Sequence, residues 1–205
     1  LRNVHHQPNL CYAFNFISHK EPPESVRVFT SSGLPIPILG KNNDLTLSVK
    51  KVANILQVSF SANNYIDTNT YLGNSRGTET NCVNMKIPLL KSKNQLIGDT
   101  SGLLIKLGAL LEEVVVNDES QVKQYLDENF NIIDSDSTHM ARFILFKNLK
   151  PGNTIVKFGL SDKVMMSELI HLINGQITFV DDSFYTTSMV SVKFFKRNLM
   201  SKKDE

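Results

Sequence analysis

The stretch Leu56-Gln57-Val58-Ser59-Phe60 places apolar and polar side chains alternately along the chain. Successive side chains of a β-strand point to opposite faces, so this pattern predicts a strand with one buried and one solvated face. The same alternation recurs in five other segments of the 205-residue chain, at 26–28, 45–49, 83–87, 155–158 and 190–194. The recurrence predicts an all-β protein.

Turn-forming residues separate these segments. Gly, Asn, Ser or Pro residues cluster at 31–33, 40–44, 62–64, 151–153 and 174–175, and their backbones turn easily. This spacing predicts an antiparallel sandwich or barrel with turns at regular intervals.

Little helix is expected. Only 120–128, with Val122, Tyr125 and Leu126 at helical spacing, is predicted to form one or two helical turns. The stretch 103–116 fits either strands or a helix, and its β-branched valines at 114–116 favour strands.

A polar run at 91–95 divides the chain into halves of similar length. Each half has about the size of a β-sandwich, so we expect one sandwich domain over 1–93 and a second over 94–205. The second domain ends in a basic tail that contains Lys196, Arg197, Lys202 and Lys203.

Charge and hydropathy exclude some classes of partner. The formal net charge is only +2, and the basic residues are scattered outside the tail, so no nucleic-acid-binding surface is predicted. No apolar run reaches the roughly 18 residues of a transmembrane helix. Residues 1–8 lack the core of a signal peptide, as expected of a chain whose targeting segment has been removed.

Residues 134–158 resemble the carboxypeptidase-regulatory-like and transthyretin-like sandwich modules. These modules have a polar turn, an F-x-F strand and a leucine-proline-glycine corner, which here corresponds to Leu149, Pro151 and Gly152. Pro151 sets φ at the first central turn position and Gly152 tolerates the positive φ of the next, while Leu149 anchors the turn in the core. Residues 172–177 resemble the final hairpin, but Ala141 stands near where the family usually has glycine.

The resemblance implies two tandem immunoglobulin-like or transthyretin-like β-sandwich domains without enzymatic activity. Such modules serve as structural or protein–protein interaction parts of exported assemblies, so an extracytoplasmic location is expected: periplasm, outer envelope or secreted. The partners would be other proteins. The alternative is a small-ligand or carbohydrate-binding sandwich, with Tyr65, Tyr71 and Tyr185 as the available flat aromatic surface.

Motifs for catalysis, metals or cofactors are not found in the sequence. There is no Gly-x-Ser-x-Gly, no phosphate-binding loop and no HExxH or Cys-x-x-Cys pair. Acidic turns at 134–136 and 181–182 lack the glycine and distal glutamate of an EF-hand. We therefore expect no catalytic residues, metal or cofactor, and the sequence identifies no ligand-binding residues.

The two cysteines, Cys11 and Cys82, both lie in the first half. They fit a disulfide in an oxidising compartment, and two buried thiols fit nearly as well. If joined, they would fasten the first strand to the last strand of that half and stabilise it by roughly 4 kcal/mol.

Overall fold

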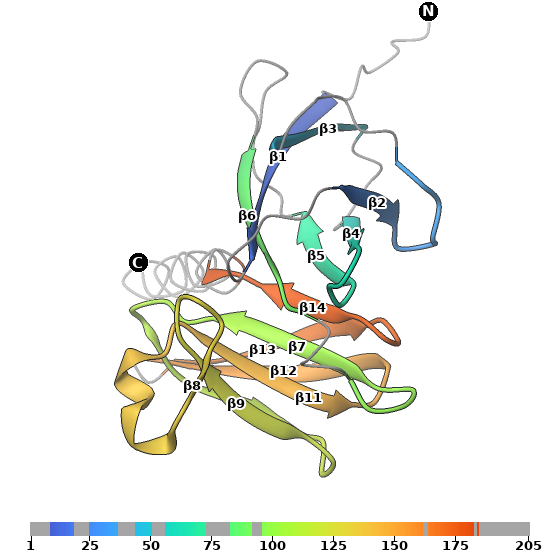
Figure 1. Ribbon diagram of the computed structural model, residues 1–205. Coiled ribbons are helices and arrows are strands. Elements are labelled where there is room, and N and C mark those ends of the chain that lie inside the picture. The colour runs from blue at the N-terminus through green and yellow to red at the C-terminus, as the bar shows by residue number, and fades with distance from the viewer. Residues whose placement is uncertain are drawn as a thin grey trace, which may run out of the picture.

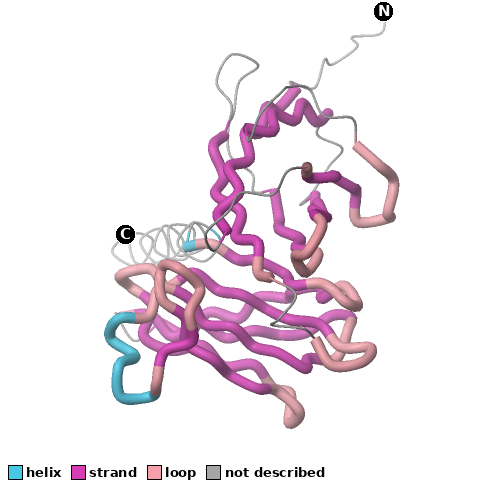
Figure 2. Tube along the Cα trace, in the orientation of Figure 1, coloured by secondary structure: helices cyan, strands magenta, loops and turns pink. Residues whose placement is uncertain are grey.

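The computed structural model describes residues 9–18, 25–36, 44–50, 56–72, 83–91, 96–161, 164–182 and 184. The strands are β1 (Asn9–Ser18), β2 (Val26–Thr30), β3 (Asp44–Lys50), β4 (Leu56–Ala62), β5 (Thr68–Leu72), β6 (Val83–Leu89), β7 (Ser101–Lys106), β8 (Leu111–Val116), β9 (Val122–Leu126), β10 (Ile132–Ile133), β11 (Phe143–Leu149), β12 (Gly152–Leu160), β13 (Val164–Leu172) and β14 (Ile177–Val180). A short 3-10 helix, η2 (Ser135–Met140), lies between β10 and β11 in the chain, and Figure 2 draws helical residues in cyan. The all-β class predicted from the sequence is confirmed.

The strands form three sheets. An eight-stranded sheet has the order β10-β9-β11-β7-β14-β5-β4-β2, and two three-stranded sheets have the orders β3-β1-β6 and β13-β12-β8. Figure 1 shows β1, β3 and β6 at the top of the molecule and β8, β12 and β13 in its lower part.

The large sheet contributes side chains to two separate cores. Leu104 of β7 belongs to the core that includes β1 and β6 residues, whereas its neighbours Leu103 and Ile105 belong to the core formed with β8, β12 and β13. Neighbouring side chains of a strand point to opposite faces, so the two cores lie on opposite faces of the large sheet. All three residues are 0% exposed.

Strand β14 connects the first and second halves of the chain. It pairs parallel with β5 through Ile177 and Thr68, and parallel with β7 through Ile177 and Gly102. In Figure 1 it lies between β5 and β7. Strands from both predicted domains therefore share one sheet. The predicted boundary at 93–94 lies outside the described residues, and the division into two folding units stays a prediction.

Three sequence-based expectations are corrected. The helix predicted over 120–128 is strand β9, because its residues pair with β11 and Leu126 enters the core. The purely antiparallel arrangement is wrong, since β14 is parallel to both neighbours and β1 is parallel to β6. The expected final hairpin at 172–177 is a crossover, because β13 and β14 belong to different sheets.

Other strand predictions have clear outcomes. The segments at 26–28, 45–49, 56–60, 83–87 and 155–158 lie in strands, and 103–116 forms β7 and β8 rather than a helix. The predicted strand at 190–194 and the basic tail lie outside the described residues.

Candidate protein-binding edge

Strand β13 is a nine-residue edge strand of the small sheet β13-β12-β8. Its sequence alternates, and the buried side chains Met166, Ile170 and Leu172 enter the core. Met165 and Leu169 therefore point to the opposite, outer face of the sheet. They are 54% and 62% exposed.

The outer face continues as an apolar ridge onto β12. Ile155 lies directly opposite Leu169 in the antiparallel register and is 56% exposed. Opposite residues of an antiparallel pair contact each other through their side chains. We call Ile155, Leu169 and Met165 the outer ridge. Ile155 and Leu169 lie side by side, and Met165 follows on the same face of β13, beyond Ser167.

The main chain of β13 is capped at one end by side chains from the first half of the protein. The N–H of His171 donates to the Tyr71 hydroxyl at 2.7 Å, and the His171 carbonyl accepts from Gln57 Nε2 at 3.0 Å. Burial raises the pKa of Tyr71, and the His171 backbone hydrogen bond lowers it by less. Tyr71 is therefore protonated at neutral pH and can also donate to the His171 carbonyl, at 3.4 Å.

This cap shows which backbone groups of β13 face outward from the sheet. Groups on one side of an antiparallel strand belong to every second residue. Since those of His171 point away from β12, those of Met165, Ser167 and Leu169 point the same way. No described strand pairs with this side of β13. Among the described residues, the section from Met165 to Leu169 is thus an open edge, which we call the β13 edge.

Four of the other described edge strands, β2, β6, β8 and β10, carry features that hinder strand addition. The turn after β2 covers that strand, with the Ile36 N–H donating to the Val28 carbonyl at 2.8 Å. Strand β6 contains Pro88, β8 exposes Glu112 and Glu113, and β10 has only two residues. The β13 edge has neither proline nor lysine, and its one charged residue, Glu168, lies on the side of the strand that carries the core residues Met166 and Ile170.

A buried polar seam lies beside the capped end of β13 and was not predicted from the sequence. Gln57 Nε2 donates to Asn69 Oδ1 at 2.6 Å, and Gln176 Oε1 accepts from Ser59 Oγ and Asn69 Nδ2, both at 3.0 Å. The seam joins β4 and β5 to the connection between β13 and β14. The polar positions of β4 had indicated a solvated face, but Gln57 and Ser59 are 6% and 5% exposed.

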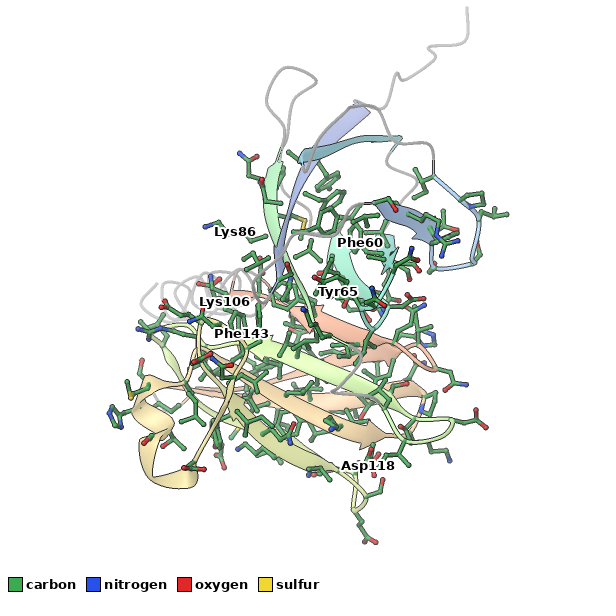
Figure 3. The ribbon with its side chains drawn as sticks, in the orientation of Figure 1. Phe60, Tyr65, Lys86, Lys106, Asp118 and Phe143 are labelled. Carbon is green, nitrogen blue, oxygen red and sulfur yellow. The ribbon has the colours of Figure 1, made fainter. Side chains whose placement is uncertain are left out.

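The predicted structural turn lies between β11 of the large sheet and β12 of the small sheet. Leu149 is 1% exposed, Pro151 is partly buried, and Gly152 has a φ of +113°. The carboxylate of Asp118, at the loop labelled in Figure 3, accepts the Lys150 N–H at 2.9 Å. No sequence motif had indicated that Asp118 contacts this corner.

Asp118 is also held by its own loop. Its Oδ1 atom accepts hydrogen bonds from the Ser120 N–H at 3.0 Å and the Ser120 hydroxyl at 2.6 Å. The Ser120 side chain is the largest cause of the lowered pKa of Asp118, followed by the Lys150 N–H. The ionised carboxylate therefore fastens the β8–β9 loop to the β11–β12 corner.

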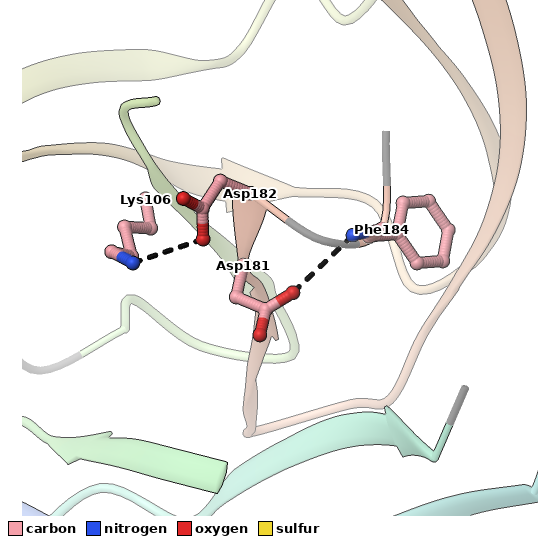
Figure 4. Close-up of polar contacts among 4 residues, drawn as sticks. All are labelled: Lys106, Asp181, Asp182 and Phe184. Carbon is pink, nitrogen blue, oxygen red and sulfur yellow. Dashed lines mark hydrogen bonds and ion pairs between the residues drawn. The ribbon is translucent and has the colours of Figure 1, made fainter. Parts of the chain in front are cut away.

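The acidic turn at 181–182 is engaged in contacts within the protein. Asp182 Oδ1 lies 2.9 Å from Lys106 Nζ, and Asp181 Oδ1 accepts the Phe184 N–H at 3.3 Å (Figure 4). Within the described ranges, no group of three or more His, Cys, Asp or Glu residues could hold a metal ion. In the expected acidic turn at 134–136, Asp134 is the N-cap of η2 and the next two residues begin that helix.

The remaining candidate residues are placed only in part. Cys11 lies in β1, opposite Ser48 of β3, while Cys82 lies outside the described residues, so the disulfide stays a prediction. Tyr65 forms a bridge with Lys91, Tyr71 caps β13, and Tyr185 lies outside the described residues. In the described part of the chain, no helix is long and apolar enough to span a membrane.

Comparisons with known proteins give only distant similarities. No family model and no curated protein matches the chain. Among solved structures, it is similar to BcpA, the major pilin subunit of Bacillus cereus, at 9% identity and a TM-score of 0.28, covering 82% of this chain and 69% of that one. It is similar to the Bacillus anthracis TIE protein at 8% identity and a TM-score of 0.29, covering 85% and 33%. A candidate adhesin from Bacteroides ovatus aligns at 10% identity and a TM-score of 0.24, covering 80% and 83%.

Proposed function

We propose that this chain is a noncatalytic structural module that contacts other proteins of a surface or envelope assembly through the β13 edge. The observation that carries the proposal is an edge that no described strand pairs with and that has neither proline nor lysine, next to exposed apolar side chains. An added strand gains main-chain hydrogen bonds from such an edge, and its alternate side chains gain contacts with the neighbouring face.

The chemistry of the outer ridge favours a protein over a small polar ligand. Ile155, Leu169 and Met165 offer apolar area without a converging set of polar groups, whereas small-molecule sites are concave and place a few polar groups around the ligand. The exposed Ser167 and Lys157 lie between the apolar residues. A strand with alternating apolar side chains fits this surface.

The same proposal includes an extracytoplasmic location and a relationship to the carboxypeptidase-regulatory-like or transthyretin-like modules. Both rest on the resemblance of residues 134–158. A bond between Cys11 and Cys82 in protein taken from its own compartment would support export.

A photo-crosslinking amino acid at Ser167 tests the role of the edge, because this side chain is exposed and its backbone faces the open side. In extract from the native source, we expect crosslinks to protein that are lost when Leu169→Lys is added. The matched variant Ile97→Lys makes the same change at an apolar residue that is 70% exposed elsewhere, and should leave the crosslinks unchanged. Absence of crosslinks, or equal loss with both variants, would refute the proposal.

A further inference from the structure

We propose that the strand that adds to β13 is β13 of a second copy of this chain, antiparallel and centred on Ser167. This inference rests on the proposed function, since it requires the β13 edge to bind protein, and it names the partner. Two copies related by a two-fold axis use the same patch on both sides, so that patch must be complementary to itself.

The hydrogen-bonding groups of the edge select the register. Met165, Ser167 and Leu169 have outward-facing main-chain groups, and His171 is already capped by Tyr71 and Gln57. With Ser167 opposite Ser167 of the second copy, Met165 lies opposite Leu169, and each of the three open residues meets an open residue. A shift of the centre to residue 168 would place Met165 opposite the capped His171, which has no free groups to offer.

The side chains on the outer face agree with this register. Met165 of each copy lies opposite Leu169 of the other, and Leu169 already lies opposite Ile155 of its own chain. The two outer ridges therefore extend each other across the seam, and the most exposed apolar side chains of this sheet gain cross-strand neighbours. No exposed apolar residue of β13 is left opposite a charge.

The charges of the edge are also compatible with a second copy. Glu168 is the one charged residue between Met165 and Leu172, and the register places it opposite Met166 rather than opposite itself. Lys157 lies on β12, one strand away from the new contact. The two small sheets thus become one continuous six-stranded sheet without directly opposed like charges.

Mass measurement of the purified protein is the first test. Light scattering after size exclusion should give a concentration-dependent species at twice the 23.1 kDa chain mass. In the dimer, Leu169 of each copy contacts Met165 of the other, so Leu169→Lys removes two contacts. We therefore expect the dissociation constant to rise about tenfold or more. Ile97→Lys is the matched control and should leave the dissociation constant unchanged.

Cysteine crosslinking tests the register independently of dimer strength. Opposite residues of a hydrogen-bonded antiparallel pair have Cα atoms about 5.5 Å apart, within disulfide range. Ser167→Cys should therefore form an oxidised dimer in excess over wild type, which carries the same Cys11 and Cys82. Leu169→Cys alone should not, because the two 169 positions are offset by roughly 13 Å, but it should crosslink to Met165→Cys in a mixture.

The results separate this inference from the proposed function. A wild-type monomer at all concentrations, together with Leu169-dependent crosslinks to a different protein, would overturn the second copy and leave the binding edge in place. If the protein neither forms a dimer nor crosslinks to another protein, both the second copy and the binding edge are overturned. Self-crosslinking of Leu169→Cys in place of Ser167→Cys would overturn the register.

Discussion

Replacing Gln176 with alanine is expected to weaken the fold, because it removes one acceptor shared by two buried donors. Gln176 Oε1 accepts from Ser59 Oγ and Asn69 Nδ2, both at 3.0 Å. Ser59 and Asn69 are 5% and 0% exposed, so water cannot readily replace the lost acceptor. A buried donor left without a partner costs about 1–3 kcal/mol, so two donors predict a loss of about 2–6 kcal/mol in the free energy of unfolding.

Urea denaturation of wild type and Gln176→Ala at neutral pH measures this loss. The midpoint should fall while the slope stays constant, since the substitution does not change the surface exposed on unfolding. Gln176→Met is the matched control, because it keeps the volume of the side chain and also lacks the acceptor. If the orphaned donors are the cause, methionine and alanine destabilise similarly. A loss under about 0.5 kcal/mol, the range of a neutral surface change, would refute the reasoning.

Three further substitutions test other features. Thr178→Val should raise the melting temperature, because the 0% exposed Thr178 hydroxyl has no partner in the described part of the chain, and its removal should stabilise by about 1 kcal/mol; a lower melting temperature would contradict this. Gly152→Ala should destabilise by about 1–2 kcal/mol through its positive φ alone, since a Cβ there meets nothing within 4 Å, and a neutral result in urea denaturation would contradict the strain. The lowered folded-state pKa of Asp118 means that its stabilising contribution is present above the unfolded pKa and is lost as pH falls through the folded pKa. The stability gap between wild type and Asp118→Ala should therefore shrink in acid below about pH 4, and a gap that widens there would refute this assignment.

Local alternation predicted strands well where it was strong. Segments such as 56–60 and 155–158 lie in β4 and β12, because a period of two is a property of neighbouring residues alone. Strand β9 was missed because Val122, Tyr125 and Leu126 also fit a helical period, and pairing with β11 decided between the two. A segment of five residues contains too few periods to separate the alternatives.

Local alternation could not predict which residues cover the face of a strand. The alternation in β4 identified Gln57 and Ser59 as sharing a face, but the residues that bury this face, including Gln176, are more than 100 positions away. Likewise, the turn residues at 174–175 indicated a reversal of the chain without showing that it leads to another sheet. The β13 edge was missed for the same reason, since a strand becomes an edge only through the arrangement of the others.

The position of β14 in the chain has a consequence for synthesis on the ribosome. Its partner β5 is made early, but Ile177 follows Thr68 by 109 residues. At about 5–20 residues per second, β5 waits roughly 5–20 s for the strand that covers its edge. Until then the growing chain exposes the edge of β5 that does not pair with β4, with long-range contacts still to form, a state that folds slowly and aggregates readily. Codon choice or chaperone access between residues 72 and 177 would therefore influence the yield of folded protein more than changes after β14.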